Sequence, residues 1–172
     1  MLQRTVHENV LYELDQERAL DIYKRYLGNY AAELPSSGLL FPFEMLGADR
    51  ESRGVIRTLL GVNEADGSLT LAGDIDPDGY LKLMHASTDR LIDGAHKAAQ
   101  AIVPMQSGSG AAVAVLVSCI GRRLVMGDRV DEELEAVVET LGPQVVSTGF
   151  YSNGEISEAG LRTECRLYNQ TM

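Results

Sequence analysis

The pattern of hydrophobic and polar residues along this chain changes between a helical period and an extended one. In the helical segments, apolar residues recur every three or four positions, which is the spacing of one face of an α-helix. Three segments follow this rule: residues 16–30, with apolar positions from 19 to 27 and Gly28 as the expected exit, a segment with apolar positions from 91 to 102, and one with apolar positions from 130 to 141. We expect Asp15 and Asp128 to cap the first and the third helix, and either Ser87 or Thr88 to cap the second.

Extended segments are more numerous and are rich in β-branched and aromatic residues. They are residues 9–14, 39–46, 80–86, 111–117, 144–151 and 162–168, together with two strands within residues 53–75, one on each side of Asp66-Gly67. Asp66-Gly67 predicts the tight turn of a hairpin. Pro42 cannot donate to a ladder, so we expect an edge strand or a bulge there and not a central strand. The unbroken apolar run 111–117 predicts a strand buried on both faces, and residues 106–110 before it predict a loop.

These elements together predict an α+β fold, with a mainly antiparallel sheet and about three helices packed on it. Predicted strands outnumber helices by about two to one, and short hairpins join several of them. The chain has 172 residues, of which 45% are hydrophobic, which is enough to bury one core. We therefore expect a single domain over residues 1–172.

The charge balance excludes several classes of partner. Twenty-five acidic residues against fifteen basic ones give a net charge of -10, which repels phosphate backbones and anionic lipid surfaces. We expect no nucleic acid partner and no membrane association. The two cysteines, Cys119 and Cys165, have neither metal-site nor disulfide-framework spacing, so a reducing, cytoplasmic location is predicted.

No metal site is legible in the sequence. Asp74, Asp76, Asp78 and Gly79 match the opening of a calcium-binding loop, but the twelfth position is His85 and not the required glutamate. An Asp/Pro/Gly turn explains the same residues. The three histidines are far apart and lack the spacing of zinc ligands.

The segment around Cys119 raises three possibilities: a nucleophile, an anion site or a turn. Nothing near Cys119 in the sequence resembles a catalytic base, so a packed turn is favoured over an activated thiol. Gly121 gives the segment flexibility, and the guanidinium of Arg122 suits a carboxylate. The anion site and the plain turn both stay open on this evidence.

A second polar turn follows the strand that ends near Tyr151. Asn153, Gly154 and Glu155 stand between two predicted strands, where binding groups are often carried on a rigid scaffold. The alternative is that Asn-Gly forms only a hairpin turn. The residues alone favour neither possibility.

Taken in order, several stretches resemble the C-terminal domain of the FIST family, named for F-box and intracellular signal transduction proteins. The stretches are NVLYELDQERALDIYKRYLG, LLFPFEML, GDIDPDG with LKLMHAS, SCIGRR with MGD, GFYSNGEIS and CRLYNQTM. The similarity covers nearly the whole chain. Members usually carry a further FIST domain at the N-terminal side, so the resemblance implies that this chain is a fragment whose partner domain is absent.

The resemblance implies a sensory, ligand-binding module of a bacterial signalling protein and not an enzyme. Its expected ligands are small molecules such as amino acids. Some relatives are regarded as haem-based gas sensors that act through a histidine kinase or a cyclic-di-GMP system, and this alternative would use His85 or His7. Many relatives have a histidine just before NQTM where this chain has Tyr168, so no cofactor is our first expectation. A third alternative is an interaction module whose acidic face, residues 128–139, docks a kinase or a cyclase.

The predicted ligand site is a cleft bordered by the two polar turns, because these motifs bring functional groups to strand ends. Arg122 would hold a carboxylate and Glu155 an amine, while Tyr151 and Asn153 would shape the pocket. The predicted ligand-binding set is Cys119, Gly121, Arg122, Tyr151, Asn153, Gly154 and Glu155. No catalytic residue is predicted.

Overall fold

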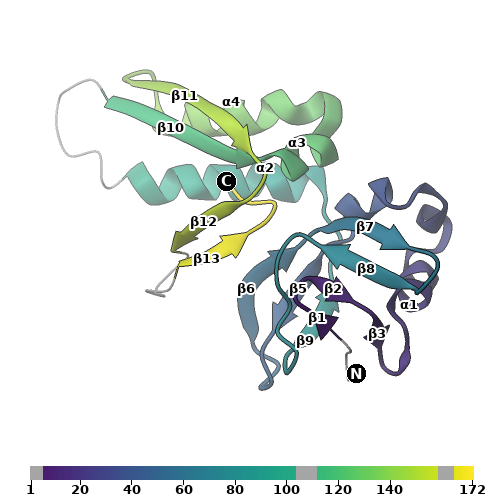
Figure 1. Ribbon diagram of the computed structural model, residues 1–172. Coiled ribbons are helices and arrows are strands. Elements are labelled where there is room, and N and C mark those ends of the chain that lie inside the picture. Colours follow the sequence, from purple (N-terminus) through teal and green to yellow (C-terminus); the bar gives the residue numbers. More distant parts are fainter. Residues whose placement is uncertain (1–5, 104–111, 159–164) are drawn as a thin grey trace. The chain divides into compact units, whose positions relative to one another are not determined.

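The computed structural model describes residues 6–103, 112–158 and 165–172, and the chain divides into two compact units (Figure 1). The first unit comprises Met1–His85 and Glu155–Asn169, and the second comprises Ala86–Gly154 and Gln170–Met172. Each unit has its own hydrophobic core. The predicted loop 106–110 lies outside the described residues, and the single domain over residues 1–172 stays a prediction.

The first unit consists of short antiparallel strands with one α-helix and two 3₁₀ turns. Its strands form four small sheets, with the orders β1-β2-β8-β7, β6-β5-β9, β3-β4 and β12-β13. The elements are β1 (Val6–His7), β2 (Val10–Leu11), β3 (Glu13–Leu14), β4 (Glu17–Arg18), α1 (Ala19–Leu27), η1 (Gly28–Glu33), η2 (Ser36–Leu40), β5 (Phe43–Leu46), β6 (Ser52–Arg57), β7 (Leu59–Asn63), β8 (Ser68–Leu71), β9 (Tyr80–Leu83), β12 (Glu155–Glu158) and β13 (Cys165–Tyr168).

The second unit is a two-stranded parallel sheet with helices along it (Figure 1). Ala95 and Ala99 of one helix and Val137 and Leu141 of another form its core, against which Leu116 packs. The elements are α2 (Thr88–Ile102), β10 (Ala112–Cys119), α3 (Ile120–Met126), η4 (Gly127–Arg129), α4 (Val130–Leu141) and β11 (Val145–Ser152).

The α+β fold class is confirmed. The three predicted helices form as α1, α2 and α4, and every ladder in the described residues is antiparallel except that between β10 and β11. The short helix α3 was not predicted, because the segment after Cys119 was interpreted as a turn. Cys119 is extended and the helix begins at the next residue.

One of the three predicted helix caps forms. The Ser87 side chain accepts a hydrogen bond from the backbone N–H of Arg90, at 3.4 Å, at the start of α2. The Asp15 cap is wrong, because Asp15 and Gln16 both have positive φ and make the turn of the β3-β4 hairpin. The Asp128 cap is also wrong, because a 3₁₀ turn precedes α4 and no side chain caps that helix.

The expectation that the Pro42 segment is not a central strand is wrong, although the ladder between β5 and β6 does contain an irregularity of the bulge type, between Met45 and Leu46. β5 lies between β6 and β9 and pairs with both. Pro42 immediately precedes β5, so its missing N–H is not needed inside the ladder, and its carbonyl accepts the N–H of Met84. The Asp66-Gly67 hairpin is confirmed as β7-β8, with Gly67 at a φ of 75°.

The prediction that residues 111–117 form a strand buried on both faces is wrong for the part that is described. Along β10, Val113 and Val115 are 69% and 63% exposed, while Ala114 and Leu116 point toward the helices. On β11, Val146 and Phe150 are 65% and 61% exposed. An apolar run can therefore be covered on one face only, and the other face of this sheet stays open.

The core of the first unit packs α1 against the strands of the β1-β2-β8-β7 sheet. Leu11, Leu20 and Leu69 are almost fully buried. Tyr23 on α1 is also buried, and its hydroxyl donates a 2.8 Å hydrogen bond to the carbonyl of Phe41. Burial raises the pKa of the Tyr23 hydroxyl far above its ordinary value, because the phenolate would lose its hydration.

This burial predicts a loss of stability at alkaline pH. The raised pKa of Tyr23 means that the unfolded state ionises first, so its contribution is complete below about pH 10 and falls as the pH rises further. Tyr23→Phe should cost about 1 kcal/mol at pH 7 through the lost hydrogen bond, yet flatten the alkaline decline. Urea unfolding from pH 7 to 11 measures both effects. Tyr26→Phe, at a 73% exposed position, is the control, and equal alkaline slopes for wild type and Tyr23→Phe would contradict the prediction.

Candidate functional site

Three of the predicted site residues lie at the junction of β10 and α3. Cys119 is the last residue of β10 and is 4% exposed, and Gly121 and Arg122 are buried in the first turn of α3. The backbone N–H of Cys119 donates to the carbonyl of Thr171 at 2.9 Å. Cys119, Gly121 and Arg122 therefore lie next to one another at the strand end, and their role in ligand binding stays a prediction.

Arg122 uses its guanidinium donors inside the second unit. Its Nε donates to Oε1 of Glu133 at 2.5 Å, and its Nη2 pairs with the same oxygen. Nη2 also donates to the carbonyl of Leu91 at 2.7 Å, and Nη1 donates to the carbonyl of Gln170 at 3.4 Å. A ligand carboxylate at Arg122 would have to compete with Glu133, so a direct contact stays a prediction.

Glu133 is the residue near this network that sequence reasoning missed. The acidic face of α4 was interpreted as solvated, but the Glu133 side chain is fully buried. Its second carboxylate oxygen accepts a 3.2 Å hydrogen bond from the Ser118 hydroxyl. A spacing of four residues to Val137 and again to Leu141 places Glu133 on the inner stripe of the helix, which was the available signal.

The second predicted turn divides between the two units. Tyr151 lies on β11, and the guanidinium carbon of the exposed Arg123 stands 5.1 Å from its ring centroid. Burial, reinforced by the field of Glu133, raises the pKa of Tyr151. Asn153 and Gly154 connect β11 to β12, but β12 pairs with β13, so the Asn-Gly turn does not form a hairpin. Glu155 belongs to β12 of the first unit.

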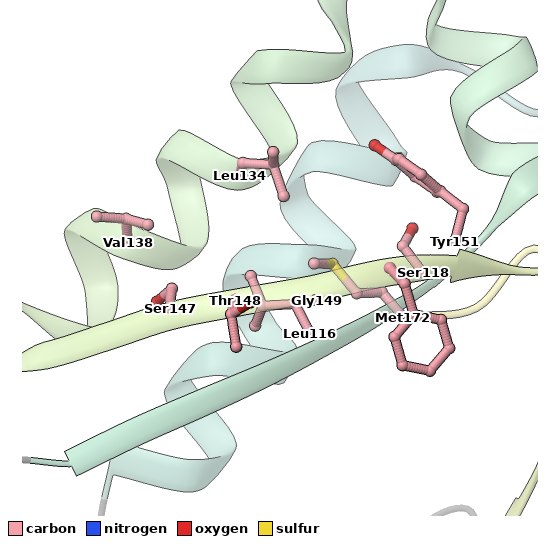
Figure 2. Close-up of a pocket in the computed structure, with 10 residues that line it drawn as sticks. Leu116, Ser118, Leu134, Val138, Ser147, Thr148, Gly149, Tyr151 and Met172 are labelled. Carbon is pink, nitrogen blue, oxygen red and sulfur yellow. The ribbon is translucent and has the colours of Figure 1, made fainter.

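The second unit contains a groove between α4 and the two parallel strands (Figure 2). Its volume is about 250 Å³. Leu134 and Val138 come from the helix, and Ser147 and Tyr151 come from β11. The Ser147 Oγ is buried and has no hydrogen-bond partner among the described residues. Of the predicted site residues, Tyr151 alone lines this groove.

The first unit contains a separate pocket of about 310 Å³, built around a buried cation. Arg57, the last residue of β6, is 7% exposed. Its Nε donates to the carbonyl of Asp74 at 2.8 Å, and its Nη1 donates to the carbonyls of Ile56 and Leu167 at 3.2 and 2.9 Å. Within the described part of the chain, its Nη2 makes no hydrogen bond and no carboxylate lies within 4 Å of the guanidinium.

The charges in this pocket are of both signs. Burial lowers the pKa of Arg57, and the nearby carboxylate of Asp74 opposes that shift. An arginine nevertheless keeps its proton at neutral pH. Asp74 is exposed and lines the same pocket, which Arg166 also lines. The cation of Arg57 and the anion of Asp74 therefore face one small space.

The remaining walls of the pocket are apolar, and the loop that contains Gly73 packs closely against the Arg57 side chain. Met45, Val55 and Leu167 line it together with Gly73. A Cβ at Gly73 would lie 3.1 Å from the guanidinium carbon of Arg57, and the φ of 131° also favours glycine.

Sequence reasoning missed the Arg57 pocket. Asp74 was interpreted as either a calcium ligand or part of an Asp/Pro/Gly turn. Asp76 of the same loop uses its Oδ1 to accept the N–H of Asp78, as an Asx turn does. No group of three or more metal-ligating side chains occurs among the described residues. The signal for Arg57 was a charged residue at the end of a strand between Ile56 and Thr58.

The histidines have ordinary surroundings within the described residues. The His85 ring lies beside that of Phe41, with ring centroids 5.2 Å apart and the planes tilted by 50°, and His7 is exposed. His96 Nδ1 lies 2.7 Å from the Thr140 hydroxyl. The haem alternative that would use His85 or His7 stays a prediction.

Comparison with known proteins identifies the family of this chain. In the described residues, no helix has the length and apolar character needed to cross a membrane. No curated protein and no solved structure matches the chain. A model of the FIST C domain matches residues 19–158, which is more than half of the chain and includes both pockets described above except at their C-terminal residues. The chain therefore belongs to the FIST C domain family, a family of sensory domains in signal transduction.

Proposed function

We propose that this sensory domain binds a small α-amino acid with an apolar side chain in the Arg57 pocket. The observation that carries the proposal is the buried guanidinium of Arg57, which has a free Nη2 and no carboxylate partner among the described residues. Buried charges in proteins are normally paired. A ligand carboxylate would supply the missing partner.

The second charge of the pocket matches the other end of an amino acid. Asp74 is exposed at the pocket, so its carboxylate is accessible to a ligand ammonium group. Hydrogen bonds between oppositely charged groups are stronger than neutral ones. A zwitterion therefore satisfies both charges, whereas a simple anion satisfies only that of Arg57.

The size and lining of the pocket favour an aliphatic ligand. Its volume of about 310 Å³ is near the lower end of ligand pockets, which suits a metabolite. Met45, Val55 and Leu167 offer apolar contact to a side chain such as that of leucine or methionine. The domain would bind such a ligand without transforming it.

Asp74→Asn is the decisive variant. A thermal-shift screen with leucine, isoleucine, valine and methionine identifies the best ligand, because a ligand that prefers the folded state raises its apparent stability. With leucine as the probe, Asp74→Asn should weaken binding by roughly tenfold through loss of the charge-assisted contact. The deaminated analogue 4-methylpentanoate has no ammonium group, so the same variant should not weaken its binding. Isothermal titration measures both.

Asp78→Asn is the matched control, because Asp78 is an exposed aspartate of the same loop that does not line the pocket. It should bind leucine as wild type does. Absence of binding by every apolar amino acid would contradict the proposal, as would equal losses for Asp74→Asn and Asp78→Asn.

The turn site predicted from the sequence is a second candidate, favoured by the cation of Arg123 over the Tyr151 ring. The sequence prediction gives the carboxylate to Arg122, which is buried, and we add the exposed Arg123 as the cation that a ligand could reach. Arg123→Gln separates the two candidates. Loss of leucine binding in Arg123→Gln but not in Asp74→Asn would favour the turn site.

A further inference from the structure

The outer edge of β11 is open to another strand. β11 has eight residues and pairs in parallel with β10 alone, and no other strand among the described residues pairs with it. Outside the ladder, the N–H of Cys119 at the end of β10 donates to the carbonyl of Thr171, and the N–H of Val145 at the start of β11 donates to the carbonyl of Gly142. A long edge with unpaired backbone groups is a template for strand addition.

The groove beside this edge has room for side chains. Leu134 and Val138 on α4 stand above β11 and are 38% and 44% exposed (Figure 2). Below them, the buried Oγ of Ser147 has no partner in the described part of the chain. A buried hydroxyl without a hydrogen bond calls for a partner from outside. An added strand would bring side chains and backbone groups to this point.

The rim of the groove is acidic. Asp131 and Glu135 each precede one of the groove-lining helix residues by three positions, which places them on the same side of α4. Both are exposed and make no ion pair with any described residue. Burial raises the pKa of Tyr151 on β11, and of the charges near it Glu133 raises that pKa, Arg123 lowers it and Asp131 raises it by less, so charges of both signs lie near this end of the strand. Asp131 and Glu135 therefore favour positive charge on the part of a partner that faces α4.

The face of β11 that points away from α4 is apolar, so it favours apolar residues at every second position of an added strand. Val146 and Phe150 are exposed there, so apolar side chains of an added strand would extend an apolar surface. Lysine or arginine residues on the helix-facing side can lay their aliphatic stems on Leu134 and Val138 and reach the acidic rim. A second copy of this chain fits poorly, because two acidic rims and two net charges of -10 would meet.

We propose that the edge of β11 docks an extended segment of a partner protein in which basic and apolar residues alternate, added to the sheet as a third strand. The groove leaves room for the partner's side chains, the Ser147 hydroxyl lacks a hydrogen-bond partner within the described residues, and the acidic residues of α4 attract its basic residues. The proposal is independent of amino-acid binding in the Arg57 pocket, since every residue involved lies in the second unit.

Synthetic peptides test the proposal with the 172-residue chain. The parent probe is a fluorescein-labelled peptide of alternating valine and lysine, and its binding is measured by fluorescence anisotropy. Two further peptides carry N-methyl groups on all valines or on all lysines, which removes the backbone donors along one edge or the other without changing the charge. Strand addition predicts that one methylated peptide binds at least tenfold more weakly than the other. Equal affinities for the two methylated peptides, or no binding of the parent peptide, would overturn the proposal.

Variants of the protein test the surface itself. Asp131→Asn with Glu135→Gln should weaken binding of the parent peptide at least tenfold. Glu33→Gln with Asp78→Asn removes the same charge from exposed positions of the first unit and should leave binding unchanged. Equal losses in the two double variants would show attraction to net charge only and would overturn the proposal. A dimer of the unliganded chain that Val138→Lys dissociates would also overturn it, in favour of a second copy.

Discussion

Replacing Arg122 by methionine is expected to lower the free energy of unfolding by about 3–5 kcal/mol, because it leaves the carboxylate of Glu133 buried without its counterion. The Arg122 and Glu133 side chains are 5% and 0% exposed, so water cannot replace the lost partner. The change also removes the donors to the carbonyls of Leu91 and Gln170. Urea unfolding followed by circular dichroism measures the loss.

A double variant distinguishes the effect of an unpaired buried charge from the other effects of the Arg122 substitution. Arg122→Met with Glu133→Leu removes both charges, so it should be more stable than Arg122→Met alone. Arg129→Met is the control, because Arg129 pairs with Asp89 and Glu132 at the surface and its loss should barely move the unfolding midpoint. A double variant as unstable as the single one would contradict the view that an unpaired buried charge causes the damage.

The second large effect is expected at Gly149, where β11 approaches β10 closely. A Cβ at this position would lie 1.9 Å from the carbonyl oxygen of Leu116, which is backbone and cannot rotate away. Gly149→Ala should therefore push the two strands apart and cost about 3 kcal/mol, the upper range for overpacking. Thermal unfolding measures the loss, and hydrogen exchange should locate it in residues 112–119 and 145–152.

Gly61→Ala is the matched control for this substitution. Gly61 also lies in a strand, has no positive φ, and a Cβ there would meet nothing within 4 Å. The same chemical change should leave the melting temperature nearly unaltered. If Gly149→Ala were as stable as Gly61→Ala, the close approach of the two strands would be refuted.

Local signals in the sequence predicted the elements that depend on neighbouring residues. The three long helices follow from apolar spacing, and the β7-β8 hairpin follows from Asp66-Gly67, because both are encoded within a few residues. Pairing across the chain could not be predicted in this way. Nothing local indicates that β5 lies between β6 and β9, or that β12 pairs with β13 and not with β11.

The candidate sites show the same limit. Arg122 was recognised as functional-looking because an arginine after Gly121 suits an anion, but its partner Glu133 lies eleven positions away among other acids. Arg57 and Asp74 are separated by seventeen positions and meet only because the loop after β8 returns to the end of β6. Charge complementarity between such distant residues has no periodic signature, so only the fold reveals it.

The discontinuity of the first unit has a consequence for the way this protein is made. Residues 165–169 complete that unit: the carbonyl of Leu167 accepts a hydrogen bond from Arg57, and the Asn169 side chain lies 3.5 Å from the backbone nitrogen of Thr58. A ribosome releases these residues only after it has translated the whole of β10, α4 and β11. The strands β1 to β9 must therefore wait until β13 has been translated before their unit can close.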